Sequence, residues 1–234
     1  MEYTLHAYNN RESLIEGLAR HIQASLTSGL GQREQASMVL AGGSTPMPLY
    51  AALARADLPW ENVTALPSDE RWVPATDPAS NHLQISRQFG KQPLQLGRLV
   101  PEAPGTNPDT GTARQVVATL PEPFDAVVLG MGGDGHFASL FPHSPALAEG
   151  LDPDSRETAL VVTPDPLPPD APFARISLTL ARLLHARELI LLITGEDKRL
   201  VLEEAARADA DPETLPIAAL IRAAGKRLNV FWSP

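Results

Sequence analysis

The spacing of hydrophobic residues alternates along the chain between the period of a helix and the short apolar runs of buried strands. Residues 11–30 place Leu14, Ile15, Leu18, Ile22 and Leu26 on one face, which predicts a helix that ends at Gly29. Further helices are predicted over 46–56, 82–89, 111–120, 179–184 and 197–208. Apolar runs predict strands over 37–41, 63–67, 98–101, 124–129, 159–163, 175–178, 188–194 and 229–232.

This alternation of strands and helices predicts an α/β fold: a doubly wound, mostly parallel sheet with helices on both faces. The run at 124–129, FDAVVL, has the nearly continuous apolar character of a strand covered on both sides. The 23 prolines cluster in segments such as 101–108 and 164–172, and none of these is long enough to be a linker. We therefore expect residues 1–234 to form one domain.

The amino-acid composition argues against several classes of function. The 234 residues carry a net charge of −9, and no basic arm offsets it, so nucleic acid is a poor partner. No cysteine is present, which excludes disulfides, thiolate catalysis and zinc-thiolate sites. The first ten residues are polar rather than signal-like, and the longest apolar run, 189–193, is too short to span a bilayer. The expectation is a cytoplasmic protein without a membrane partner.

Ligands of open parallel sheets collect at the carboxyl ends of strands, and unusual residues follow several predicted strands. The segment 40–49, LAGGSTPMPL, places Gly42, Gly43, Ser44 and Thr45 between a strand and a helix that begins at a proline. The glycines allow backbone N–H groups to approach a ligand closely. Hydroxyl groups at the start of a helix favour the binding of an anion such as phosphate. An ordinary capped turn is the alternative interpretation.

Charged residues follow two other strands. The segment 66–74, LPSDERWVP, brings Asp69, Glu70 and Arg71 directly after a strand, and the guanidinium of Arg71 suits a phosphate or an oxyanion. In 193–199, ITGEDKR, Lys198 lies near a helix start within reach of a phosphate. The alternative in both segments is a solvated charged loop.

The most unusual stretch is 127–142, VVLGMGGDGHFASLFP, which contains G-x-G-x-x-G at Gly130, Gly132 and Gly135. A dinucleotide site requires a long helix after the last glycine, and here prolines close the segment after a turn or two. The glycines instead present Asp134 and His136 at the edge of the sheet, where His136 is placed as a general base. A histidine held only by packing is the alternative. No histidine pair has the spacing of a metal site, so no metal is expected.

The segments LAGGSTP, SDERWVP, SNH, GMGGDGHFASLFP, RISLTL and ITGEDK resemble the 6-phosphogluconolactonases in order and spacing over essentially the whole chain. The resemblance implies hydrolysis of 6-phospho-D-glucono-1,5-lactone in the pentose phosphate pathway, without a cofactor. It supports the roles of His136 as base and Arg71 as ligand for the phosphate or the oxyanion. Asp134 is expected either to hold the turn or to orient the histidine. The phosphorylated sugar lactone would be bound by Gly42, Gly43, Ser44, Thr45, Asp69, Arg71 and Lys198.

Two other functions stay open. The related aminosugar-phosphate deaminases share similar loops but have a glutamate five residues after the histidine, where this chain has Phe141. Because phenylalanine cannot ionise, this departure favours the lactonase. A non-catalytic sugar-phosphate sensor would need a DNA-binding module, for which the sequence shows neither room nor basic surface. We expect a monomer or a weak homodimer, and the segment 164–172 is a candidate rim of the site.

Overall fold

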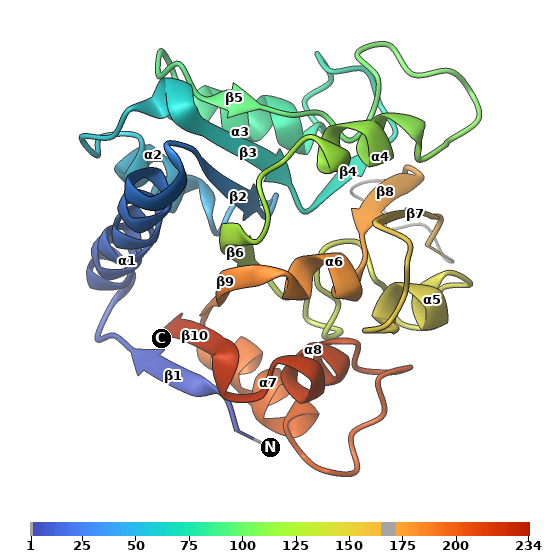
Figure 1. Cartoon of the computed structure of the whole chain (residues 1–234). Coiled ribbons are helices and arrows are strands. Elements are labelled where there is room, and N and C mark those ends of the chain that lie inside the picture. The colour runs from blue at the N-terminus through green and yellow to red at the C-terminus, as the bar shows by residue number, and fades with distance from the viewer. Residues whose placement is uncertain (1, 165–171) are drawn as a thin grey trace.

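The computed structural model describes residues 2–164 and 172–234 of the chain. Its centre is a seven-stranded sheet in the order β1-β10-β9-β6-β2-β3-β5, in which every pairing is parallel (Figure 1). The strands are β1 (Thr4–Ala7), β2 (Ala36–Leu40), β3 (Val63–Pro67), β5 (Gln95–Leu96), β6 (Phe124–Leu129), β9 (Ala186–Thr194) and β10 (Leu228–Ser233).

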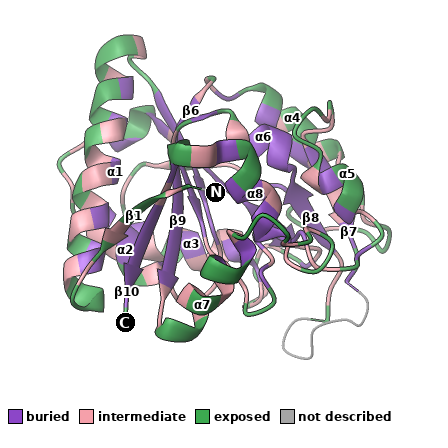
Figure 2. Ribbon diagram, turned by 90° about the horizontal axis from the view of Figure 1, so that it is seen from below, coloured by how far each residue is buried: buried purple, intermediate pink, exposed green. Residues whose placement is uncertain are grey.

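Helices cover both faces of this sheet, as the sequence predicts. One face is covered by α1 (Arg11–Arg33), α2 (Met47–Leu53) and α3 (Asn81–Phe89). The other face is covered by α4 (Gly111–Ala118), α5 (Leu147–Leu151), α6 (Leu180–Leu184), α7 (Glu196–Ala205) and α8 (Ile217–Ala224). Figure 2 shows the buried strands between α1 on one side and α6 and α8 on the other.

The alternation of side chains along each strand divides the apolar residues into two cores. In β2, Met38 and Leu40 belong to the core under α1, whereas Val39 faces the core under α6 and α8. The same alternation separates Val128 from Val127 in β6. Continuous apolar runs in these strands are therefore a consequence of burial on both faces.

A second sheet of three antiparallel strands, in the order β4-β8-β7, flanks the large one. It consists of β4 (Asp69–Arg71), β7 (Ala159–Val162) and β8 (Arg175–Leu178). The sequence predicts β7 and β8 but treats residues 69–71 as a loop. Their pairing with β8 makes them a strand, because backbone hydrogen bonds to a buried neighbour outweigh the low strand propensity of charged residues.

Other boundaries differ from the predictions. The predicted strand at 98–101 is wrong: the strand in this region is β5, which ends at Leu96. Helix α1 does not end at Gly29 but continues to Arg33, and Glu34 then adopts a left-handed φ of 60°. The predicted rim at 164–172 falls largely on residues 165–171, outside the described part of the chain. Among the described residues, no helix has the length and apolar character needed to cross a membrane.

Candidate active site

The candidate site is a cavity of about 420 Å³ at the carboxyl ends of β2, β3, β6 and β9. Strands β2 and β6 are neighbours in the sheet, and the chain order reverses direction between them. A reversal of this kind is the point at which open α/β sheets bind ligands, because the loops that follow the two strands diverge. The cavity is lined by the loops after β2, β3 and β6 and by the last residues of β9, together with residues of β4, α3, β8 and α7.

His136 is presented by the glycine turn that follows β6. Its Nδ1 lies 2.6 Å from Oδ1 of Asp134, and the same oxygen accepts the backbone N–H of His136 at 3.2 Å. Burial alone would raise the pKa of Asp134, but the hydrogen bonds and charge of His136 outweigh burial and lower that pKa. Asp134 is therefore ionised at neutral pH, and it orients the imidazole so that Nε2 is its free nitrogen.

The turn requires two of its glycines. A Cβ on Gly132 would lie 2.1 Å from Nδ1 of His136 and 2.4 Å from Oδ1 of Asp134, so a side chain there would displace the pair. Gly135 has a φ of +75°, in the region that other residues rarely adopt. The glycine pattern thus serves the histidine–aspartate pair rather than a dinucleotide.

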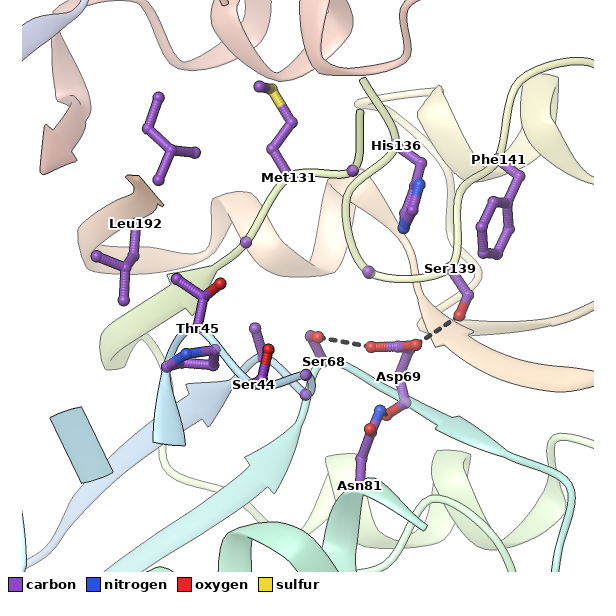
Figure 3. Close-up of a pocket in the computed structure, with 18 of the residues that line it drawn as sticks. Ser44, Thr45, Ser68, Asp69, Asn81, Met131, His136, Ser139, Phe141 and Leu192 are labelled. Carbon is purple, nitrogen blue, oxygen red and sulfur yellow. Dashed lines mark hydrogen bonds between the residues drawn. The ribbon is translucent and has the colours of Figure 1, made fainter. Parts of the chain in front are cut away.

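The opposite wall is the loop between β2 and α2, from which Ser44 and Thr45 line the cavity (Figure 3). Gly43 has a φ of +88°, which allows the chain to turn sharply there. A Cβ on Gly42 would lie 2.0 Å from Oδ1 of Asn81, so this glycine permits the loop to pack against the start of α3. The loop therefore brings hydroxyls and backbone N–H groups to the cavity.

Asp69 lies between two serines on the floor of the cavity. Ser68 Oγ donates to its Oδ1 at 2.9 Å, and Ser139 Oγ donates to its Oδ2 at 2.5 Å (Figure 3). The side-chain amide of Asn81 donates to the backbone oxygen of Asp69 at 2.8 Å. Because each carboxylate oxygen can accept more than one hydrogen bond, Asp69 retains capacity for hydroxyl groups of a ligand.

Glu70, next in the chain, is turned into the protein instead. Its carboxylate accepts the backbone N–H groups of Arg71, Asn81 and His82 and the hydroxyl of Ser80, at 2.7–2.9 Å. Burial raises the pKa of Glu70, and these four hydrogen bonds offset part of that effect. Glu70 therefore fixes the start of α3, and with it the position of Asn81.

Three cationic side chains line the cavity. Arg71 and Arg175 lie directly opposite each other in the β4–β8 register, and Lys198 comes from the first turn of α7. Arg71 donates through Nη1 to Oδ1 of Asn81 and to the backbone oxygen of Ala79, both at 2.7 Å. Like charges at opposed positions destabilise a sheet, so an anion in the cavity would relieve this arrangement.

Burial also affects the chemistry of two of these cations. It lowers the pKa of Arg175, which is 3% exposed, while the carboxylate of Asp69 opposes this shift. Burial likewise lowers the pKa of Lys198, and the carboxylate of Asp134 opposes it. Partly desolvated cations bind anions more strongly than cations in water, because the local dielectric constant is lower.

The structure brings the residues predicted from sequence into one place. All of them except Asp134 line the cavity, and Asp134 contacts His136; the set is Gly42, Gly43, Ser44, Thr45, Asp69, Arg71, Asp134, His136 and Lys198. The sequence analysis missed Arg175, Asn81 and Ser139 as lining residues. An arginine at the first position of the predicted strand 175–178 was the only local signal for Arg175, and it does not reveal the pairing that brings this residue to the cavity.

No group of three or more His, Asp or Glu side chains within residues 2–164 and 172–234 is placed to hold a metal ion. The cavity instead combines a histidine–aspartate pair, hydroxyl groups and three cations. Such a set can activate water at one point and hold an anion at another.

Comparisons with known proteins agree with the motifs. The profile of the family described as Glucosamine-6-phosphate isomerases/6-phosphogluconolactonase matches residues 9–232. A 6-phosphogluconolactonase of Caulobacter vibrioides is 36% identical over 98% of this chain and 97% of its own length. One of Mesorhizobium japonicum is 37% identical over 99% and 96% of the two chains.

Solved structures agree as well. The crystal structure of a 6-phosphogluconolactonase from Shewanella baltica superposes with a TM-score of 0.90 at 30% identity, covering 100% of this chain and 98% of that one. The α/β fold and the resemblance inferred from the motifs are both confirmed. The chain belongs to the glucosamine-6-phosphate isomerase/6-phosphogluconolactonase family.

Proposed function

We propose that this protein hydrolyses 6-phospho-D-glucono-1,5-lactone to 6-phospho-D-gluconate, the lactonase step of the oxidative pentose phosphate pathway. The observation that carries the proposal is the His136–Asp134 pair, which faces a cavity lined by three cations and the Ser44–Thr45 loop. One end of such a site suits an ester carbonyl and water, and the other suits a phosphate. The relatives that carry the lactonase name support the same assignment.

His136 acts as the general base. With Nδ1 held by Asp134, its neutral Nε2 removes a proton from water, and the resulting hydroxide attacks C1 of the lactone. The negative charge that develops on the carbonyl oxygen is stabilised by backbone N–H groups of the glycine turn or by Arg71. The imidazolium then protonates the ring oxygen as the C1–O bond breaks, which regenerates neutral His136 and opens the ring.

The phosphate binds between Lys198, Arg175 and the loop that contains Gly42, Gly43, Ser44 and Thr45. The directly opposed Arg71 and Arg175 place two positive charges side by side, which favours a ligand anion, and the phosphate supplies two negative charges. Arg71 serves either the phosphate or the oxyanion. An Arg71→Ala variant with a raised KM assigns it to the phosphate, and a loss confined to kcat assigns it to the oxyanion.

Asp69 contributes differently from the cations. A carboxylate repels a phosphate, but the two serine hydroxyls leave it able to accept further hydroxyl groups. Asp69 therefore binds hydroxyls of the sugar ring. We further propose that the chain is a single catalytic domain that acts in the cytoplasm as a monomer or weak homodimer, without a cofactor.

The function is tested by generating the lactone from glucose 6-phosphate with a dehydrogenase and following its loss by NMR. Glucosamine 6-phosphate is offered in parallel, and released ammonia is measured. Faster loss of the lactone than in buffer, without ammonia, is the expected result. Ammonia would assign the protein to the deaminases, and a lack of both reactions with folded protein would leave a sugar-phosphate sensor.

The role of His136 is tested by His136→Ala, with His185→Ala as control, because His185 is 65% exposed and lies at the opposite end of the sheet. General base catalysis contributes roughly 10²–10⁴-fold, so His136→Ala should lose at least about tenfold in kcat with little change in KM. The control should turn over normally. Normal turnover of His136→Ala would reject His136 as the base.

A further inference from the structure

Phe141 lies at the wall of the cavity, and its ring contacts the base directly. The centroids of the Phe141 and His136 rings are 4.3 Å apart, with 34° between the ring planes. Figure 3 shows the two rings side by side, on the side of the cavity opposite Ser44 and Thr45. The same aromatic ring contacts the guanidinium of Arg175, whose Cζ lies 4.9 Å from its centroid. Nothing in the mechanism above uses this contact.

The backbone around Phe141 is fixed by hydrogen bonds on both sides. Leu140 donates to the backbone oxygen of Phe137 at 3.0 Å, and Ser139 donates its N–H to Ser177 Oγ at 3.2 Å. The backbone oxygen of Phe141 accepts the N–H of Ser144 at 3.3 Å. A ring mounted on a segment held this way presents a fixed surface to the imidazole rather than a mobile one.

The imidazole of His136 requires a second contact to fix its orientation. Asp134 restrains it at one atom, Nδ1, and a hydrogen bond to a single edge atom leaves the ring able to tilt about that contact. The half-buried Phe141 lies against the imidazole ring and opposes this tilt. Tilting would move Nε2 away from the water that it activates, and a displacement of about 1 Å at a reacting centre can cost roughly 100-fold in rate.

We propose that Phe141 is a positioning residue for the lactonase reaction, which holds the His136 imidazole in its working orientation by ring contact. The proposal rests on the proposed function for its kinetic consequence. Arg175 depends less on this ring, because its Nη1 also donates to the backbone oxygen of Phe173 at 3.0 Å and the carboxylate of Asp69 attracts it. Loss of the ring should therefore affect the base more than the phosphate.

The kinetic test compares Phe141→Leu with Phe141→Tyr. Aromatic contacts of this kind correspond to roughly two- to tenfold in an equilibrium or a rate, so Phe141→Leu should lose that factor in kcat with KM nearly unchanged. Phe141→Tyr retains the ring and should restore most of kcat. If Phe141→Leu does not fold, Phe141→Met replaces it in the same comparison.

The matched control is Phe124→Leu. Phe124 is fully buried and has a guanidinium over its ring, that of Arg182 at 4.1 Å, but it lies at the start of β6, away from the cavity. The control should lower the melting temperature and leave kcat unchanged. A Phe141→Leu enzyme with wild-type kcat, or a Phe141→Tyr enzyme as slow as Phe141→Leu, would overturn the proposal.

An NMR measurement tests the contact independently of turnover. In the wild-type protein, the ring current of Phe141 should displace the ring-proton resonances of His136, assigned by their absence in His136→Ala. Phe141→Leu should abolish this displacement and Phe141→Tyr should retain it. Unchanged His136 resonances in Phe141→Leu would reject the positioning role even if the protein were a lactonase. Failure of the lactonase assay with the resonances displaced would reject the function and not the contact.

Discussion

At the scale of single residues, the site depends on the contact between Asp134 and His136. The carboxylate is about half exposed, 49% by its side chain, so the contribution of its charge to stability is reduced by solvent. The direction of that contribution is nevertheless defined. A folded-state pKa below the unfolded value means that ionised Asp134 stabilises the folded protein above the unfolded pKa, and that this stabilisation is lost as the pH falls through the folded pKa.

Asp134→Asn should therefore reduce the stability of the protein at pH 7. The difference from wild type should begin to shrink below roughly pH 4, where unfolded carboxyl groups become protonated, and should vanish only below the lowered folded-state pKa of Asp134. The measurement is thermal unfolding from pH 7 to pH 3. Asp154→Asn, in an exposed turn, is the control and should run parallel to wild type. A constant offset between Asp134→Asn and wild type at every pH would contradict the assigned interaction.

At the scale of elements, α1 shows why a glycine is not always a helix end. Gly29 is buried inside α1, and a Cβ there would lie 2.3 Å from Oδ1 of Asp125 in β6. Gly31 has nothing within 4 Å of the corresponding position and is exposed. The sequence analysis could not distinguish the two, since the contact that requires Gly29 comes from a residue 96 positions later in the chain.

Substitution by alanine should change the free energy of unfolding in opposite directions at the two glycines. Gly31→Ala should stabilise the protein by about 0.5–1 kcal/mol, because alanine has the higher helix propensity. Gly29→Ala should destabilise it, because the new methyl group must displace the buried Asp125. Chemical denaturation of both variants measures the difference, and stabilisation by Gly29→Ala would show that α1 can move away from β6 at no cost.

An element could be predicted when the pattern of its own residues specifies it, and not when pairing with a distant segment does. Strands β3, β6 and β8 were predicted to the residue, because β3 and β6 are short, mostly apolar runs and β8, RISL, alternates polar and apolar residues. Helix α8 was missed although its buried residues have helical spacing, because it is only eight residues long and consists mostly of alanine and isoleucine, a short apolar run that periodicity alone does not assign to a helix. Strand β4 was missed because only its antiparallel pairing with β8 makes Asp69–Arg71 extended.

The same distinction applies to the site. His136, Ser44 and Lys198 were predictable, since each follows the end of a strand within its own segment. Arg175 was not, because it reaches the cavity through the register that sets it opposite Arg71, more than 100 residues earlier in the sequence. The local sequence pattern specifies which side chains a loop carries. Pairing between strands that are distant in the sequence decides which of these loops lie together around the cavity.

At the scale of the whole molecule, one end of the large sheet forms the candidate site and the other end contains a buried ion pair that stabilises the fold. The carboxyl ends of the strands form the cavity, and the amino end of β6 holds the fully buried carboxylate of Asp125. That carboxylate accepts from Arg33 Nη2 at 2.5 Å and from the N–H of Ser37 at 2.9 Å, so it joins the end of α1 to β2. Burial raises the pKa of Asp125, and the Ser37 hydrogen bond and the charges of Arg33 and Arg187 oppose this effect.

Removing the charge of Asp125 at the amino end of β6 should therefore lower the stability of the protein and leave its activity unchanged. Asp125→Asn leaves Arg33 beside an uncharged partner, and breaking a buried ion pair in this way costs about 3–5 kcal/mol, or less here because the Arg33 side chain is 22% exposed. Its melting temperature should fall clearly, while kcat and KM measured well below that temperature should equal those of wild type. His136→Ala should show a different balance, with only a small fall in melting temperature from the lost contact with the half-exposed Asp134 but a large loss of kcat. Impaired kcat in folded Asp125→Asn would mean that strain at the amino end of β6 reaches the glycine turn that follows its carboxyl end, and that the two ends of the sheet are coupled.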